Sequence, residues 1–388
     1  AGSPPEVINA RAFNACLPIE DNALNQQPGE LVERLNRGDS VVTVGDGVIS
    51  LGVFNGPAGL LAALACRQCT IFLKRGSYNM AGLGTITVTS GTRIIGEVGS
   101  STSIFVDTTT EVPGIKLLED SGLENIVINR GVGDFDTAAV WLSGARSYVN
   151  KCRINDLSTV GVSVLFHGGQ ELRLIDTRIT KTGRSAIVVS YSGAMPPDSA
   201  GYIPFAGYYA DRAGVHIERC RVTMTGAGSL TIPAVHLGAG LGVHFRQNTI
   251  TTSGVALLVE GAMVGDSDSP ATFLGRDTHH VVGNLILTPA GAGSNDVNVV
   301  WLKAANIQFS DNVLDVTGVT SEATLPGCGL VLTTAVAGCG NQRVTGNVIR
   351  GMLTGIRVEG VANQREVLIS GNTVLPFSTA YGNQRAIH

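Results

Sequence analysis

Proline, aromatic side chains and charged side chains are all scarce in this sequence. Of its 388 residues, 14 are proline, 5% are aromatic and 15% are charged, whereas 50 are glycine. Frequent Val, Ile and Thr between glycine-rich turns favour many short strands over helices, so we expect an all-β protein. Lys and Arg number 27 against 31 Asp and Glu, which gives a net charge of −4. This balance provides no long-range attraction to nucleic acid or to an anionic membrane, and neither is expected as a partner.

Long apolar runs and a leader peptide are also missing. No run reaches the ~18 residues that a membrane-spanning helix needs, so we expect no membrane insertion. The N-terminal stretch AGSPPEVINARAFN has no charged segment followed by an apolar core, which predicts a protein without a secretion signal. A small residue at position 1 fits a cytoplasmic product whose initiator methionine was removed, although a cleaved leader or the remnant of a tag would look the same.

Cysteine and histidine do not form a metal-binding pattern. Seven cysteines, an odd number spread over a large domain, argue against a disulfide framework and favour assembly in a reducing cytoplasm. Cys66 and Cys69 form one CxxC pair without a second pair nearby, whereas zinc needs four ligands. His279 and His280 are neighbours in a strand-like stretch, so they point to opposite faces. We therefore expect no metal and no cofactor.

A repeat runs through most of the chain. The segments FRQNTI, VVGNLI, FSDNVL, VTGNVI and ISGNTV each place an asparagine at the same point, and four earlier segments continue this frame with other residues. The nine anchor positions are Ile126, Cys152, Thr177, Cys220, Asn248, Asn284, Asn312, Asn347 and Asn372. The third residue before and the second residue after every anchor are apolar, which a chance frame would not give.

Stacked coils explain this frame. Coils of about 25 residues, each with two or three short strands, predict a right-handed, single-stranded parallel β-helix of about nine or more coils. Its anchor asparagines would stack inside a turn as a hydrogen-bonded ladder.

Successive side chains of a strand point to opposite faces. The fourth residue before each anchor is next to an apolar residue that should face inward, so it should itself face outward. Seven consecutive coils place a polar, aromatic or basic group there, namely Tyr148, Arg173, His216, His244, His280, Gln308 and Arg343. Two residues further on, Glu218 and Arg246 join the same face. We call these nine residues the outer column. It is either a glycan-binding groove or a solvated, subunit-contacting face with incidental ion pairs.

The outer column also offers candidates for catalysis. A lyase needs a cation that neutralises the substrate carboxylate and a base near the α-proton, roles that Arg246 and His244 could fill, with Glu218 as acid or base. The candidate binding residues beside them are Tyr148, Arg173, His216, His280 and Arg343. Glycoside hydrolysis instead needs two carboxylates ~5 to 9.5 Å apart. Two aspartate pairs occur in expected loops, where solvated carboxylates are the simpler interpretation: Asp134 with Asp136, and Asp266 with Asp268.

The longest interval between anchors contains a tyrosine-rich segment, residues 190–212. It holds four of the seven tyrosines, including the candidate binding residues Tyr202, Tyr208 and Tyr209. Aromatic residues on a loop beside a β-helix can stack on sugar rings or form the apolar centre of an oligomer contact, and both interpretations stay open.

The chain before residue 101 differs from the repeats. Residues 1–40 are polar with one expected short helix, and we assign them to an N-terminal arm. Residues 41–100 contain an expected amphipathic helix, GPAGLLAALACR, and the first strands, in CTIFLKRGSYNM, ITVTS and TRIIGE. A helix here would cover the open end of the solenoid, which otherwise exposes an unpaired edge. The expected parts are therefore an arm (1–40), a cap with the first strands (41–100) and the β-helix (101–388).

The order of VGDGV, the LLAALA helix, TIFLKRGSY and ITVTSGTRIIGEVG resembles the N-terminal signature of the pectate-lyase-like β-helix superfamily. That superfamily includes bacterial polysaccharide lyases, hydrolases and epimerases as well as phage tailspikes. The stretch INARAFNACLPIEDNALNQQPGELVERLN resembles the leading segments of phage virion proteins that carry such a helix. Neither the paired-aspartate motifs of polygalacturonases nor the arginine signature of pectate lyases is present, so the resemblance specifies the fold better than the function.

The resemblance implies a virion structural protein of a tailed bacteriophage, either a tailspike, a fibre or a head-attached spike. Such a protein would be a homotrimer, assembled in the cytoplasm of the bacterial host, with residues 1–40 attached to other virion proteins and a surface for host polysaccharide. The alternative is a polysaccharide lyase or other carbohydrate-active enzyme that acts on acidic glycans and is secreted or periplasmic. A third alternative is a passive structural rod without a ligand. The expectation leans away from an enzyme.

Overall fold

The computed structural model describes residues 41–45, 56–65, 68–97, 102–106, 112–132, 137–167, 170–189, 213–225, 232–238, 241–260, 279–289, 297–304, 306–317, 326–333, 341–360, 367–375 and 385–387. The predicted arm, the tyrosine-rich segment with Tyr202, Tyr208 and Tyr209, and both aspartate pairs lie outside the described residues.

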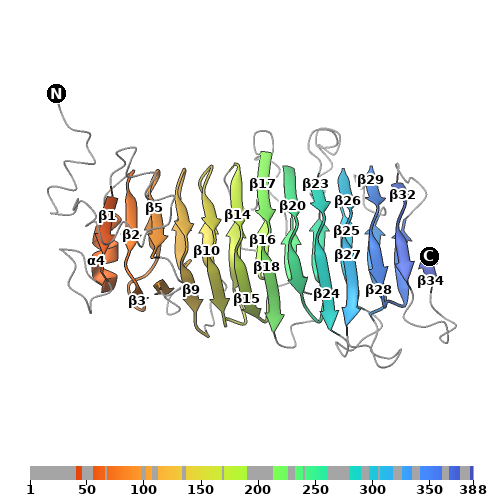
Figure 1. The fold of residues 1–388 in the computed structure, drawn as a ribbon, viewed down its shortest axis with the longest axis horizontal. Helices are drawn as coiled ribbons and strands as arrows, with labels where there is room; N and C mark the ends of the chain where they lie inside the picture. The colour runs from red at the N-terminus through yellow and green to blue at the C-terminus, as the bar shows by residue number, and fades with distance from the viewer. Residues whose placement is uncertain are drawn as a thin grey trace, which may run out of the picture.

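The described strands form three all-parallel sheets that wind around one long axis (Figure 1). Sheet 1 comprises β1 (Val41–Val44), β2 (Thr70–Leu73), β5 (Arg93–Gly96), β8 (Gly122–Glu124), β11 (Tyr148–Asn150), β14 (Leu172–Ile175), β17 (Ala213–Glu218), β20 (Leu241–Arg246), β23 (His279–Val282), β26 (Ile307–Ser310), β29 (Gln342–Thr345) and β32 (Val367–Ser370). Sheet 2 comprises β3 (Gly76–Asn79), β6 (Thr102–Phe105), β9 (Val127–Arg130), β12 (Arg153–Asp156), β15 (Arg178–Thr182), β18 (Arg221–Thr225), β21 (Thr249–Thr251), β24 (Leu285–Pro289), β27 (Val313–Thr317), β30 (Val348–Arg350) and β33 (Thr373–Leu375). Sheet 3 comprises β4 (Ile86–Val88), β7 (Ile115–Leu117), β10 (Ala138–Leu142), β13 (Val162–Phe166), β16 (Ile187–Val189), β19 (Val235–Leu237), β22 (Leu257–Glu260), β25 (Asn298–Lys303), β28 (Cys328–Thr333), β31 (Thr354–Glu359) and β34 (Arg385–Ile387).

One coil takes one strand from each sheet, and each strand pairs with its equivalent in the coil before and the coil after. In the described part of the chain the two shorter sheets have 11 strands each, so the stack has eleven complete coils. Two of these, β2–β3–β4 and β5–β6–β7, precede the nine coils that the repeat predicted. The prediction of a right-handed parallel β-helix with nine or more coils is therefore confirmed.

The interior of the coils is filled by the apolar positions of the repeat. The third residue before the anchor, as in Leu123, Ile217 and Phe245, has no exposed surface in the first eight anchor coils. The second residue after the anchor, as in Ile128 and Ile250, is equally buried in these coils. Each buried aliphatic side chain contributes ~1.5–3 kcal/mol relative to an exposed one, so stacking the coils supplies the main stabilisation of the rod.

The turn between sheets 1 and 2 explains the anchors. The residue before each anchor has a left-handed backbone, at φ values of 49° to 69° including Asp176 and Gln247, with glycine at three of the later turns. This conformation turns the chain so that the anchor side chain points along the stack. Asn284 Nδ2 donates to Asn312 Oδ1 (2.9 Å) and to the backbone carbonyl of Phe245 (3.0 Å). The same pattern joins all five anchor asparagines, which confirms the ladder.

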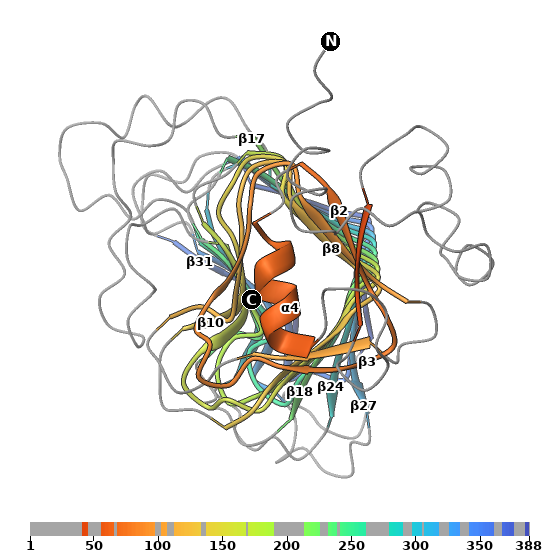
Figure 2. The ribbon, with the colours of Figure 1, turned by 90° about the vertical axis from the view of Figure 1, so that its left-hand side faces the viewer.

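Helix α4 (Gly56–Ala63) lies across the N-terminal end of the coils (Figure 2). It packs against β1 and β3 and buries Leu60 and Ala63, whereas Ala62 is exposed. The predicted cap is therefore present, because one apolar face of the helix covers the first coil. Within the described residues, the helix is too short to cross a bilayer.

Four of the seven cysteines lie among the described residues, and all four are buried: Cys69, Cys152, Cys220 and Cys328. Burial raises the pKa of the Cys152 and Cys220 thiols to about 12. Such thiols stay protonated and pack as small apolar side chains. Cys66, the partner of Cys69 in the CxxC pair, lies outside the described residues.

Candidate functional site

Strand register places the outer column along the outer surface of sheet 1. Each residue at the fourth position before an anchor is paired with its equivalent in the next coil, from Tyr148 and Arg173 through to Gln308 and Arg343. Glu218 is likewise paired with Arg246. Neighbouring strands of a sheet lie ~4.8 Å apart, so the column presents one side chain at each such step along the rod.

Three imidazoles form a stack in the middle of the outer column. The ring centroids of His216 and His244 are 4.7 Å apart with planes at 9°, and those of His244 and His280 are 5.0 Å apart with planes at 6°. Each histidine ring is partly buried by its neighbours. The parallel in-register strands impose this geometry, because equivalent side chains adopt equivalent rotamers one coil apart.

Polar neighbours orient these rings. Arg246 Nη2 lies 3.0 Å from His244 Nδ1, and since a guanidinium only donates, Nδ1 accepts and the proton of the neutral ring is on Nε2. His280 Nδ1 lies 3.0 Å from Gln308 Oε1, and His216 Nδ1 lies 3.7 Å from Glu218 Oε1. The stack therefore presents both N–H donors and nitrogen acceptors, which suits hydroxyl groups.

Two imidazoles of the stack, those of His244 and His216, resist protonation. Burial lowers the pKa of His244 to about 4, and the nearby positive charges of His216, Arg246 and His280 lower it further. Burial also lowers the pKa of His216, although the Glu218 carboxylate opposes this shift. At neutral pH His244 and His216 are consequently uncharged, whereas the arginines of the outer column carry positive charge.

Glu218 is the one carboxylate of the outer column. Its oxygens lie 3.7 Å from His216 Nδ1 and 3.5 Å from Arg219 Nη1, and its side chain is 27% exposed. Glu218 therefore lies beside His216 in the stack. A hydrolytic pair needs a second carboxylate on the same face, and no other outer-column residue supplies one.

Tyr148 is the first residue at the N-terminal end of the outer column. Its ring lies flat over Gly122, where an added Cβ would be 2.3 Å from Tyr148 Cζ, and its hydroxyl donates to the buried Glu124 carboxylate. A tyrosine held in this way covers the sheet, and its hydroxyl is already engaged. Arg173, in the next coil, is exposed, as is Arg343 near the other end.

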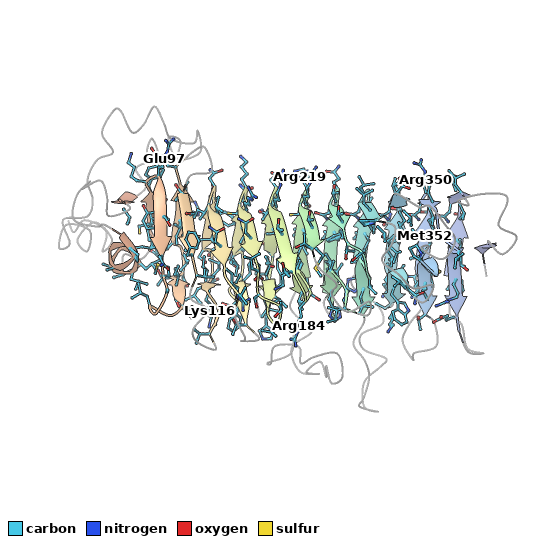
Figure 3. The ribbon with its side chains drawn as sticks, turned by 90° about the horizontal axis from the view of Figure 1, so that it is seen from below. Glu97, Lys116, Arg184, Arg219, Arg350 and Met352 are labelled. Carbon is cyan, nitrogen blue, oxygen red and sulfur yellow. The ribbon has the colours of Figure 1, made fainter. Side chains whose placement is uncertain are left out.

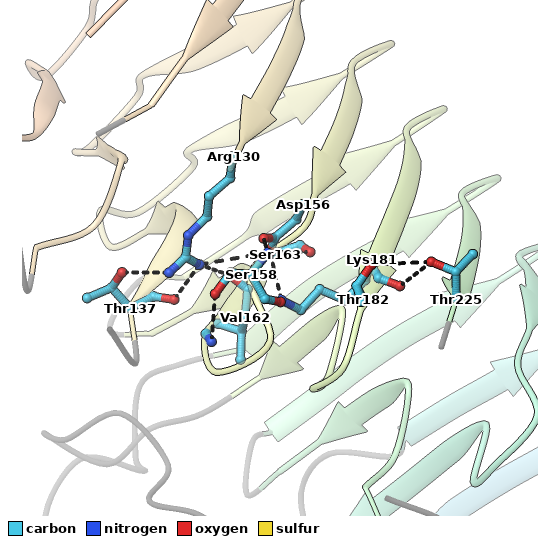
Figure 4. A network of polar contacts seen from close by, with 10 residues as sticks. Arg130, Thr137, Asp156, Ser158, Val162, Ser163, Lys181, Thr182 and Thr225 are labelled. Atoms are coloured by element: carbon cyan, nitrogen blue, oxygen red, sulfur yellow. Dashed lines mark hydrogen bonds and ion pairs between the residues drawn. The ribbon is translucent and has the colours of Figure 1, made fainter. Parts of the chain in front are cut away.

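A buried charged triad, which the sequence did not reveal, lies inside the coils (Figure 4). Lys181 Nζ is 3.1 Å from Asp156 Oδ2, and Arg130 Nη1 is 3.9 Å from the same oxygen, with every side chain at most 3% exposed. Arg130 also donates to the Thr137 carbonyl (2.8 Å), and Ser163 Oγ donates to Asp156 (2.9 Å). These contacts tie the turns between sheets 2 and 3 together. Since the group has no access to solvent, it is structural.

Both tryptophans lie on the outer face of sheet 3, which the sequence also left unassigned. Lys116 Nζ is 4.5 Å from the Trp141 ring centroid, and Lys303 Nζ is 3.6 Å from that of Trp301. The indole N–H of Trp301 donates to Thr333 Oγ1 at 2.9 Å. Each indole thus has a cation over one face, so neither is an open platform for a sugar ring.

The described residues contain no group of three or more His, Cys, Asp or Glu side chains arranged to hold a metal ion. His279 and His280 point to opposite sides of β23, as predicted: His279 is 6% exposed and faces inward, whereas His280 joins the stack.

Solved structures with a similar fold include phage tailspikes and carbohydrate-active β-helices. A tailspike variant of E. coli bacteriophage HK620, in complex with a pentasaccharide, matches with a TM-score of 0.53 at 12% identity, over 93% of this chain and 68% of the tailspike chain. Another variant of that tailspike matches with a TM-score of 0.50 at 12% identity, over 92% of this chain and 65% of the tailspike. The catalytic domain of a GH87 α-1,3-glucanase in complex with tetrasaccharides has a TM-score of 0.45 at 14% identity, over 82% of this chain and 63% of that domain.

No protein-family model matches the sequence, and no curated protein matches it. The chain spans about two thirds of the tailspike chains that it matches. At this identity the likeness shows the fold, a parallel β-helix shared with phage tailspikes, and the role of each residue has to be argued from this chain's own side chains.

Proposed function

We propose that this chain is a structural protein of a tailed-phage virion, a β-helical spike or fibre that binds a host-surface glycan. The observation that carries the proposal is the fold likeness to a pentasaccharide-bound tailspike over 93% of this chain. The N-terminal resemblance to virion proteins supports the same class. In this proposal the chain is a homotrimer assembled in the host cytoplasm, and residues 1–40 attach it to other virion proteins.

The outer column is the proposed glycan-binding face. Arg173, Arg246 and Arg343 provide guanidinium groups for carboxylates, and the imidazole stack between them provides donors and acceptors for hydroxyls. All of these groups lie on one sheet surface parallel to the rod axis, so an extended glycan chain can contact several coils at once.

Binding suits this surface better than catalysis. His244, with its pKa lowered to about 4, is a weak base at neutral pH, and Arg246 occupies its unprotonated nitrogen. Glu218 has no carboxylate partner within the outer column. The proposed spike therefore holds its glycan without cleaving it.

The test is glycan binding by the full chain and its outer-column variants. Purified wild-type protein, His244→Gln and Arg246→Gln are compared by biolayer interferometry against immobilised bacterial surface polysaccharides, including acidic ones. We expect wild type to bind at least one acidic polysaccharide, and either variant to bind it about tenfold more weakly, because each loses a charge-assisted or imidazole contact.

His236→Gln is the matched control, since His236 lies on the outer face of sheet 3, paired with Val188 and Leu258. It is expected to bind like wild type. Loss of binding in His236→Gln with full binding by both outer-column variants would contradict the proposal for sheet 1. The absence of binding to any polysaccharide would contradict the proposed function as a whole.

A further inference from the structure

Three arginines form a row on the outer surface of sheet 2. Arg153, Arg178 and Arg221 begin β12, β15 and β18, and strand register pairs Arg153 with Arg178 and Arg178 with Arg221. All three side chains are exposed. We call them the arginine row. Each is the first residue after an anchor, so successive guanidinium groups are offset along the rod by one strand spacing, ~4.8 Å.

The arginine row has no counter-charge within the described part of the chain. None of the three forms an ion pair there, and Arg153 Nε donates only to the neutral Asn155 Oδ1 at 3.1 Å. Asp176, two residues before Arg178 in the chain, is already bonded to Arg219 at 2.8 and 3.1 Å. Lys151, on the turn before Arg153, is a further exposed cation.

Such a row is unfavourable unless an anion binds to it. Like charges on directly paired strand positions repel, and this chain has a net charge of −4, so the row is a local reversal of the overall sign. If these charges served only solubility, we would expect positive and negative residues to alternate. They do so on another turn, where Arg146 Nε lies 2.6 Å from Asp120 Oδ1. The arrangement therefore indicates a ligand that supplies negative charges at the same spacing.

The residues beside the row indicate the class of ligand. The next outward position holds Asn155, Thr180 and Thr223, in register with one another. Amide and hydroxyl groups next to guanidinium groups suit a polymer that carries both carboxylates and hydroxyls. β12, β15 and β18 have no aromatic residue, so they offer no platform on which nucleic-acid bases could stack.

We propose that the arginine row is a second binding site, for an acidic polysaccharide whose carboxylates lie along the rod axis. Each carboxylate accepts two hydrogen bonds from one guanidinium, and sugar hydroxyls contact the Asn155, Thr180 and Thr223 side chains. This site is on sheet 2, whereas the outer column is on sheet 1, so either can be correct without the other.

The test uses polygalacturonate oligomers as the carboxylate-bearing probe, dextran oligomers as the neutral probe and single-stranded DNA as the phosphate-bearing probe. The full chain is compared with a triple variant, Arg153→Gln, Arg178→Gln and Arg221→Gln. Both proteins also carry Arg246→Gln, so that binding by the outer column is weakened to the same extent in both. Affinity is measured by isothermal titration at low and moderate salt.

We expect the triple variant to bind polygalacturonate at least about tenfold more weakly and with a smaller salt dependence, because three charge-assisted contacts are lost. Dextran should bind weakly to both proteins. Arg350→Gln is the control: Arg350 is an exposed arginine on β30 of the same sheet, on the same side of the rod as Arg219 (Figure 3). This variant should bind polygalacturonate like its parent.

Four results would contradict the proposal. One is equal affinity of the triple variant and its parent for polygalacturonate. Another is an equal loss in Arg350→Gln, which would show a non-specific charge effect. The third is a change of oligomeric state in the triple variant by light scattering, which would assign the row to a contact between copies. If DNA bound more tightly than polygalacturonate, the proposed polysaccharide class would be wrong.

Discussion

The two adjacent histidines of β23 show how the repeat decides the chemistry of a single residue. His280 faces outward and stacks on His244, whereas His279 faces the core, where its Nδ1 has no hydrogen-bond partner among the described residues. Burial lowers the pKa of His279 to about 4, and the positive charges of His280 and His244 add to this effect. The sequence frame predicted the opposite directions of these two side chains but not the orphaned nitrogen.

The pKa of His279 predicts acid lability of the fold. The unfolded chain binds the proton near the ordinary pKa of 6.5, whereas the folded chain binds it only near 4, so protonation favours unfolding. Stability should therefore fall as pH drops from 6.5 to 4, by up to about 1.4 kcal/mol per pH unit from this group. In denaturant titrations, His279→Leu should lose less stability over this range than wild type. Parallel losses in the two proteins would contradict the assignment.

For other residues, the sequence predicts the position in the coil but not the side-chain contacts. The fourth residue after an anchor faces inward, and this position holds Arg130, Asp156 and Lys181 in three successive coils. The frame could have shown three charges in register there, but only the structure shows that they pair within the coils. The same holds for the arginine row, one position after the anchors. The ring of Tyr148 over Gly122 depends on a side-chain rotamer that no repeat encodes.

At the scale of elements, the asparagine ladder sets the turn between sheets 1 and 2. Asn312 accepts from the backbone N–H and the Nδ2 of Asn284, both at 2.9 Å, and donates to Asn347 and to the Val281 carbonyl. The ladder was predictable because asparagine recurs in one frame. Earlier anchors are not asparagine, and there a left-handed residue and a buried Ile, Cys or Thr form the same turn.

Asn312→Ala should therefore destabilise the middle of the rod by about 2–4 kcal/mol, because it leaves several buried polar groups without partners. Asn372→Ala is the comparison, since the last rung is only partly buried and has one neighbouring rung in the described chain. It should cost less. Thermal unfolding of both variants measures the difference, and an equal loss in both would show that the ladder does not act through burial.

The first coils show why the repeat was found only from Ile126 onwards. In the nine anchor coils the inward residues on either side of the turn between sheets 1 and 2 are five positions apart, as Leu123 and Ile128 are. Strand register shows that their equivalents in the first coil are Ile71 and Tyr78, which are seven positions apart. Tyr78 is buried, and its hydroxyl donates to the Val44 carbonyl at 2.8 Å. The longer turn keeps the strands in register, but a fixed sequence frame misses the coil.

At the scale of the whole molecule, most of the architecture could be predicted from the repeat alone. Parallel coils, an N-terminal helix cap and a column of outward side chains all follow from apolar periodicity and turn residues, and all are present. Function is harder to predict from the sequence than the fold, because it depends on which outward residues of two adjoining sheets lie close together. The outer column on sheet 1 and the arginine row on sheet 2 lie on either side of the anchor turn, so basic groups border both sides of one edge.

The central claim is that this rod holds an acidic glycan without cutting it. Size-exclusion chromatography with multi-angle light scattering, run on the full chain mixed with polygalacturonate, reports protein mass, co-elution and polymer mass together. We predict a complex with three protein chains that co-elutes with the polymer, and a polymer mass that does not change during incubation. A protein of one chain's mass that elutes separately from the polymer, or a polymer mass that falls with time, would contradict the claim.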